Sequence, residues 1–126
     1  MDELKKGDTV TAIYKTGKYI GELTEIRSQH YLVRVLAVLK HPVQGDLHSP
    51  KEAEGVFFHE RRALAFREQT NVPKQMVKLH TGDVPEYTES LREAVGKMKT
   101  DLTADGSAWA QKSLQNIREL EKDYFK

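Results

Sequence analysis

The spacing of the hydrophobic residues changes once along this chain, near residue 80, and that change limits the folds open to it. Within 30–40, apolar residues stand at every second position, which is the period of a β-strand. They are Tyr31, Val33, Val35, Ala37 and Leu39. From Val84 onward the apolar residues stand three and four apart, as in an amphipathic helix. We therefore expect a β unit at 1–80, with a long loop at 41–55, and a helical subdomain at 81–126.

Short turns divide the first part into strands. The expected strands cover 9–15, 19–27, 30–40 and 56–66, with a closing strand within 73–79. Gly17 is expected to take a positive φ in the first turn. In the second strand Ile20, Leu23 and Ile26 are three apart, which predicts a bulge near Gly21. Five short strands with one bent strand are typical of a small SH3-like barrel.

The second part predicts two helices. Asp83 and Pro85 suit the start of the first helix, Asp105-Gly106 interrupts the pattern, and Ser107 can cap the second. The connection is short, so the helices should run antiparallel, and they should pack on the barrel or on a partner. The expected fold class is mainly β plus α: an SH3-like five-stranded barrel followed by a two-helix segment packed on it.

Composition excludes several classes of function. The 20 Lys and Arg residues balance 19 Asp and Glu residues, and a net charge of +1 gives no general attraction to nucleic acid or anionic lipid. Without cysteine, a disulfide, a thiolate metal site and a cysteine nucleophile are excluded. The start, MDELKKGDTV, lacks the apolar region of a secretory signal, and no window approaches the about 20 apolar residues of a membrane span. We expect a cytoplasmic protein.

Residues 41–62 are the candidate functional segment. Loops as long as 41–55 are uncommon in compact domains and are often functional or disordered. This loop and the residues after it are rich in His, Arg and aromatic residues. The candidate partner-binding residues are His41, Asp46, His48, Phe57, His59, Arg61 and Arg62.

The residues leave three alternatives to a protein-binding surface. A metal site is one, with candidate ligands His41, Asp46, His48, His59 and Glu60. A zincin motif fails because Ala63 stands four residues after His59. A nucleic-acid-binding barrel is the second, since basic residues are interleaved with aromatics. These are Arg61, Arg62, Arg67, Lys74 and Lys78, near Phe57, Phe58 and Phe66.

Enzymatic function is the third alternative. Neither a Gly-x-Ser-x-Gly elbow nor a glycine-rich phosphate loop with its lysine is present in the sequence. We therefore expect no catalytic residues, no metal and no cofactor, and keep the small nucleic-acid-binding β-barrel as the alternative to a protein-binding module.

Several long segments carry a resemblance to a known family. They are YKTGKYIGEL (14–23), QHYLVRVLAVLKHPVQGDLHSP (29–50), FFHERRALAFREQTNVP (57–73), EYTESLREAV (86–95) and LEKDYFK (120–126). Across nearly its whole length the chain resembles the kinase-associated protein B family of spore-forming Gram-positive bacteria.

The resemblance implies a non-enzymatic accessory protein of a membrane sensor histidine kinase that feeds the sporulation phosphorelay. It also implies an SH3-like barrel with a helical C-terminal part, but supplies no catalytic or binding residue. The family is often labelled a lipoprotein, yet lipid attachment needs a cysteine, and this chain has none. We expect no lipid anchor here, and expect any membrane association to run through the kinase.

Overall fold

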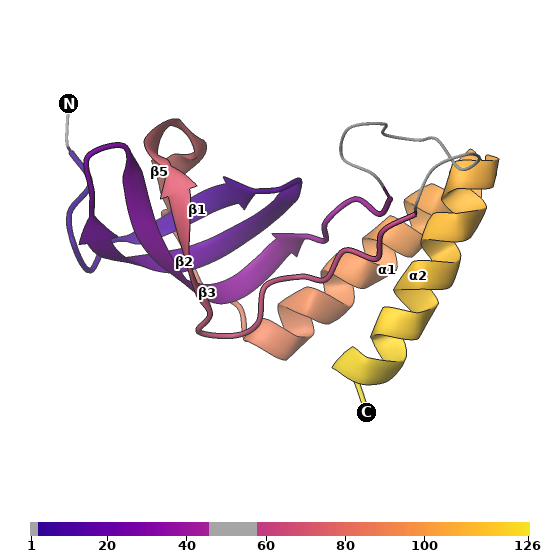
Figure 1. Cartoon of the computed structure of the whole chain (residues 1–126). Coiled ribbons are helices and arrows are strands. Elements are labelled where there is room, and N and C mark those ends of the chain that lie inside the picture. The colour runs from indigo at the N-terminus through magenta and orange to yellow at the C-terminus, as the bar shows by residue number, and fades with distance from the viewer. Residues whose placement is uncertain (1–2, 46–57) are drawn as a thin grey trace.

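A computed structural model describes residues 3–45 and 58–126 as a β-sheet beside a pair of helices (Figure 1). The strands are β1 (Thr9–Tyr14), β2 (Gly17–Ile26), β3 (His30–Lys40), β4 (Gln69–Pro73) and β5 (Val77–Leu79). All neighbouring strands are antiparallel, in the order β4-β3-β2-β1-β5, and the 3-10 turn η1 (Lys74–Met76) joins β4 to β5. Helices α1 (Tyr87–Asp105) and α2 (Ala108–Tyr124) follow.

The predicted fold class is confirmed, because a five-stranded antiparallel sheet precedes two helices that pack on it. Among the described residues the hydrogen-bonded ladder ends at β4 and at β5. The sheet is therefore barrel-like but open.

The expected irregularity of β2 at Gly21 is present. Ile20 pairs with Ala37 but Gly21 pairs with Val35, so Leu36 is left without a partner on β2. An ideal Cβ on Gly21 would lie 2.5 Å from Val33 Cγ1 and 2.6 Å from the carbonyl oxygen of Arg34. Only glycine lets the two backbones approach this closely.

The turn between β1 and β2 differs from the prediction. The positive φ values belong to Lys15 (45°) and Thr16 (71°), not to Gly17. A two-residue hairpin turn with both central residues left-handed matches the twist of the flanking strands. Gly17 has a different role: an added Cβ would lie 2.5 Å from the hydroxyl oxygen of Tyr19. Thr16 Oγ1 accepts a hydrogen bond from the Val43 N–H at 2.9 Å, which ties this turn to the end of β3.

The fourth predicted strand, 56–66, is wrong over its described part. Residues 58–66 form no strand, and the fourth strand is instead Gln69–Pro73, which pairs with His30–Arg34 of β3. Phe58 and the apolar residues at 63–66 suggested a strand here, although the alternation is weak from Arg61 to Phe66. In the structure, side chains from other elements satisfy several of its backbone groups, as described below.

Both helices begin at a side-chain cap. The cap of α1 is Glu86, not Asp83 or Pro85 as the sequence indicated, and its carboxylate accepts from the N–H groups of Thr88 and Glu89. The predicted cap of α2 is confirmed, since Ser107 Oγ accepts from the Ala110 N–H.

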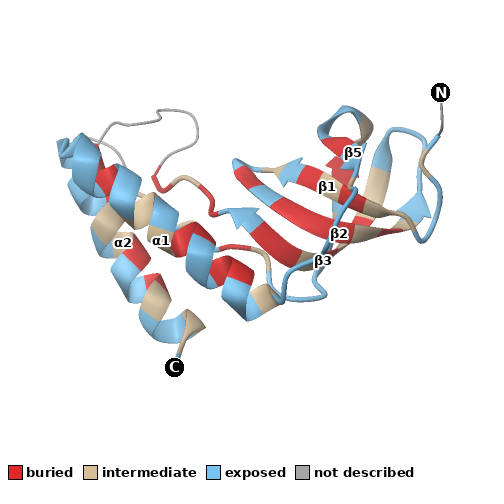
Figure 2. Cartoon of the chain, turned by 180° about the vertical axis from the view of Figure 1, so that it is seen from behind, coloured by how far each residue is buried: buried red, intermediate tan, exposed pale blue. Residues whose placement is uncertain are grey.

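Two apolar cores organise the molecule (Figure 2). One lies within the sheet and contains Val10, Ala12, Leu23, Val33, Val72 and Val77. The other joins Tyr19, Val35, Val38 and Ala63 to the inner faces of α1 and α2, including Leu91, Val95, Ile117 and Leu120. Because the second core crosses the predicted boundary at residues 80 and 81, the sheet and the helices share buried surface.

Candidate functional site

Residues 58–66, here called the strap, run between the sheet and the helices (Figure 1). Gln44 pairs with the backbone of Arg61 in both directions: its Oε1 accepts from the Arg61 N–H and its Nε2 donates to the Arg61 carbonyl, each at 2.8 Å. In addition, the Gly45 N–H donates to the carbonyl oxygen of His59 at 2.9 Å. The first half of the strap is thus fixed against the residues that follow β3.

Three tyrosine hydroxyls hold the second half of the strap. Tyr124 Oη accepts from the Ala63 N–H at 2.9 Å, and Tyr19 Oη accepts from the Leu64 N–H at 3.3 Å. Tyr87 Oη donates to the Leu64 carbonyl. These hydroxyls come from β2, α1 and α2, which explains why this extended segment does not need a neighbouring strand.

His41, a predicted partner-binding residue, is fully buried instead of exposed. Its Nδ1 lies 3.0 Å from the carbonyl oxygen of Pro42, which can only accept, so Nδ1 carries the proton of the neutral ring. Nε2 then accepts from the hydroxyl of Tyr124 at 2.9 Å. Burial lowers the pKa of His41, which favours this neutral form. His41 therefore joins the end of β3 to α2 and presents no side chain to a partner in this structure.

The other described candidates lie along the strap. His59 and Arg61 are half-buried, and Arg61 Nε donates to the Gly45 carbonyl at 3.1 Å. Arg62 is exposed, forms an ion pair with Asp123 and lies 5.1 Å from the centroid of the Tyr124 ring. Its hydrogen bond and charge lower the pKa of Asp123.

Asp46, His48 and Phe57 lie outside the described residues, so the predicted cluster is only partly visible. Within 3–45 and 58–126, no group of three or more His, Asp or Glu side chains could hold a metal ion.

A polar hollow of about 320 Å³ lies on one side of the strap. Its lining residues are Tyr14, Lys15, Tyr19, Pro42, Glu60, Arg61, Arg62, Leu64 and Glu68. Two carboxylates stand among three cations in this set, so the hollow is a mixed surface and not a continuous basic groove. It brings the predicted Arg61 and Arg62 together with the turn after β1.

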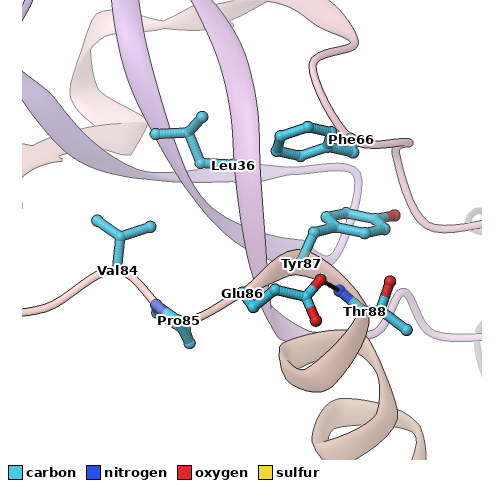
Figure 3. A pocket seen from close by; sticks show the side chains of 7 residues that line it. All are labelled: Leu36, Phe66, Val84, Pro85, Glu86, Tyr87 and Thr88. Carbon is cyan, nitrogen blue, oxygen red and sulfur yellow. Dashed lines mark hydrogen bonds between the residues drawn. The ribbon is translucent and has the colours of Figure 1, made fainter.

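An apolar pocket of about 440 Å³ lies where α1 begins (Figure 3). The pocket is lined by Leu36, Phe66, Val84, Pro85, Glu86, Tyr87 and Thr88. Figure 3 shows Phe66, Tyr87 and Leu36 grouped on one side, with the Glu86 carboxylate turned toward the Thr88 N–H. Burial raises the pKa of Tyr87 to about 12, so its hydroxyl stays protonated at neutral pH.

Sequence reasoning missed this pocket. From the sequence, Phe66 falls in the strand expected over 56–66, and Leu36 falls in the strand expected over 30–40. The bulge in the β2–β3 pairing and the turn that follows Ala65 place these two residues beside α1. The spacing in β2 predicts a bulge near Gly21, but it does not show that Leu36 of β3 is the unpaired residue, and it does not place the turn after Ala65.

No helix among the residues that the structure describes is long and apolar enough to cross a membrane.

Comparison with known proteins gives consistent matches over nearly the whole chain. The family model for kinase-associated protein B matches residues 14–125. A Bacillus subtilis (strain 168) protein named kinase-associated lipoprotein B is 59% identical over 125 residues, which is 99% of this chain and 98% of that protein. The crystal structure of kinase-associated protein B from Bacillus cereus superposes with a TM-score of 0.82 at 49% identity, covering 97% of this chain and 98% of that one.

Proposed function

This chain belongs to the kinase-associated protein B family, and from that premise we propose that it is a non-enzymatic accessory protein of a membrane sensor histidine kinase in the sporulation phosphorelay. The near full-length match at 59% identity to a protein named for kinase association carries this proposal. Among the described candidate residues, His41 is fully buried and makes its hydrogen bonds inside the protein, with Pro42 and Tyr124.

An accessory protein without catalytic groups acts by differential affinity. A protein that binds one conformation of the kinase better than another shifts the kinase toward that conformation, by no more than the difference in binding free energy. We propose that the contact lies on residues 41–62, of which Arg61 and Arg62 border the polar hollow. The contact at this hollow stays a prediction. His41 would contribute to it only indirectly, by its hydrogen bond to Tyr124, which holds the strap.

The proposal also includes a location. The relative from Bacillus subtilis is named a lipoprotein, whereas this chain contains no cysteine to which a lipid could be attached. We propose that the protein works on the cytoplasmic face of the membrane and is brought there by the kinase.

The charge distribution favours protein over nucleic acid as the partner. A single-stranded nucleic acid site needs a positive groove that follows the backbone. Here Arg61 and Arg62 lie beside Glu60 and Glu68, and the guanidinium of Arg62 is paired with Asp123. A salt-dependent shift of single-stranded RNA by the purified protein would instead support the nucleic-acid-binding alternative.

The test is a reconstitution with the cytoplasmic portions of the sensor histidine kinases of the same organism. Binding is measured by titration calorimetry, and autophosphorylation is measured with and without saturating protein. We expect saturable binding to one kinase and a change in its rate. Binding without any rate change would identify a scaffold instead of a regulator, and absence of binding to all of them would refute the proposal.

The contact surface has a separate test. Arg61→Ala removes a side chain that borders the hollow, and Arg27→Ala, on an exposed arginine at the far end of β2, is the matched control. A contact at the hollow predicts that only the first variant weakens kinase binding. Equal affinities for both variants would exclude Arg61 from the interface.

A further inference from the structure

We propose that the apolar pocket at the start of α1 is a docking site for a short partner segment that inserts an apolar side chain flanked by lysine or arginine. The identity of the partner as a kinase rests on the proposed function, whereas the chemistry of the occupant rests on the pocket itself. None of the candidate residues at 41–62 lines this pocket. Phe66, at the end of the strap, does line it.

The first argument is the exposure of apolar side chains around a preformed hollow. Phe66 is 53% exposed and Val84 is 40% exposed, and both line the pocket together with Leu36 and Tyr87. The rings of Phe66 and Tyr87 stand with centroids 5.8 Å apart. Grouped apolar side chains of this kind on a protein surface mark interaction sites, and aromatic residues dominate the energetics of such sites.

The second argument is that Phe66 is presented by a rigid turn. The Glu68 N–H donates to the Ala65 carbonyl at 3.1 Å, and Glu68 Oε1 accepts from the Ala65 N–H at 2.8 Å. Val35 of β3 then exchanges hydrogen bonds with this turn, accepting from the Arg67 N–H at 2.7 Å and donating to the Glu68 carbonyl at 2.9 Å. A side chain whose backbone is already fixed loses little conformational freedom when a partner binds.

Backbone strain in the same turn supports its assignment to a binding site. Arg67, directly after Phe66, has φ 69°, in the left-handed region that favours glycine. Residues held in such conformations persist where the surrounding structure fixes them, and they are concentrated at binding sites. Here the strained conformation sets the direction in which the chain leaves Phe66.

The third argument concerns charge. The lining segment 84–88 is flanked in the chain by Asp83 and Glu89, and all three carboxylates of this stretch, including Glu86, are exposed. None of the three is in an ion pair within the described part of the chain. The lining residues include one carboxylate, Glu86, and no lysine or arginine, while Arg34 of β3 is paired with Glu22. An apolar pocket bordered by one acidic segment is complementary to an apolar residue flanked by basic residues.

The same geometry argues against an anionic ligand. The Glu86 carboxylate already accepts from the N–H groups of Thr88 and Glu89, which are the donors that a phosphate would use at a helix start. An anion would also meet the charges of Asp83 and Glu89. The occupant is therefore expected to be apolar and cationic.

The test uses the intact protein and a synthetic peptide of sequence GSKLFKRSG, with binding followed by amide chemical shifts. We expect shifts at Leu36, Phe66 and Tyr87 that weaken as salt is raised. One control peptide has Leu and Phe replaced by serine, and another has Lys and Arg replaced by glutamate. Neither control should shift these amides.

Matched variants separate docking from general surface effects. Phe66→Ser is expected to lower peptide affinity by about tenfold or more. Its control is Leu79→Ser, which changes a residue of similar exposure (56%) on β5. The double variant Asp83→Asn/Glu89→Gln should lower affinity and reduce its dependence on salt. Circular dichroism confirms that each variant is folded.

A second readout, the affinity of the same variants for the kinase, separates this inference from the proposed function. If Phe66→Ser weakens both peptide and kinase binding, both proposals stand. If the peptide binds the pocket but no kinase binds the protein, the docking site stands and the proposed function fails. If the kinase binds but the peptide does not shift these amides and Phe66→Ser changes nothing, the docking site is refuted and the proposed function stands.

Discussion

Removing the hydroxyl of Tyr124 should destabilise this protein more than the loss of one exposed oxygen would suggest. Tyr124→Phe keeps the ring, and with it the edge contact to His41 and the Arg62 guanidinium above the ring. It removes the acceptor of the Ala63 N–H and the donor to His41 Nε2. His41 is fully buried and Ala63 is 6% exposed, so water cannot easily replace either bond.

The magnitude follows from these two unpaired groups. A buried polar group left without its partner costs about 1–3 kcal/mol, so two such groups would cost about 2–6 kcal/mol. Because Tyr124 itself is only half-buried, we expect a total at the low end of that sum, about 2–3 kcal/mol. A chain of this length loses about 4 °C in melting temperature for each kcal/mol, so Tm should fall by about 8–12 °C. Urea unfolding at pH 7.5, followed by circular dichroism, measures the loss.

The control for this experiment is Tyr31→Phe. Tyr31 is also half-buried, but its hydroxyl forms no hydrogen bond with any residue in the described ranges, so the free energy of unfolding should change by less than about 0.5 kcal/mol. If Tyr124→Phe is no more destabilising than Tyr31→Phe, the account of the strap as a segment held by side-chain hydroxyls is wrong.

Three further predictions concern stability. Burial lowers the pKa of His41 below its ordinary value of 6.5 in the folded protein. As the pH falls, His41 of the unfolded chain therefore takes up a proton at a higher pH than His41 of the folded protein. Stability should therefore be lost as the pH falls below 6.5 toward the folded pKa, and His41→Gln, whose amide oxygen can replace Nε2 as acceptor, should flatten this part of the pH profile of urea unfolding. Gly21→Ala should destabilise the protein by about 1–3 kcal/mol, because the added Cβ would lie 2.5 Å from a side-chain atom of β3. Gly96→Ala in α1, where an added Cβ has nothing within 4 Å, should stabilise the protein by about 0.5–1 kcal/mol. Equal effects of the two variants in thermal melts would contradict the cause given for Gly21. Residues 1–80 expressed alone should show no cooperative thermal transition, because the second core would lose its helical half; a sharp transition would show instead that the sheet is an independent domain.

The positions of the candidate residues illustrate where sequence reasoning ended. The length and composition of the loop point to His41 as a partner-binding residue, yet the structure buries it against Tyr124, a residue 83 positions away in the sequence. Phe66 falls in the strand expected over 56–66, yet it is exposed on a turn and lines the pocket at the start of α1. Both outcomes depend on contacts between distant segments, which local patterns do not contain.

The strand prediction failed for a related reason. The apolar residues of 58–66 suggested a strand, but they alternate poorly, because four polar residues at 59–62 precede four apolar residues at 63–66. Apolar content does not specify which groups bind the N–H and carbonyl groups of such a segment, and here they are the side chains of Gln44, Tyr19, Tyr87 and Tyr124. The neighbouring 69–73, with few apolar residues, pairs with β3 and completes the sheet.

The sequence by itself determined the local features of this protein: the period of its strands and helices, the bulge at Gly21, the cap at Ser107 and, through long segments of resemblance, its family. These features depend on neighbours in the chain, whose preferences short-range sterics and hydrogen bonding decide. Only the tertiary structure decided that the strap is held by three tyrosines, that His41 is internal and that an apolar pocket opens at the start of α1. Those features arise where β3, the strap and the helices meet, and the free energy that selects them comes from burying groups that are far apart in the sequence.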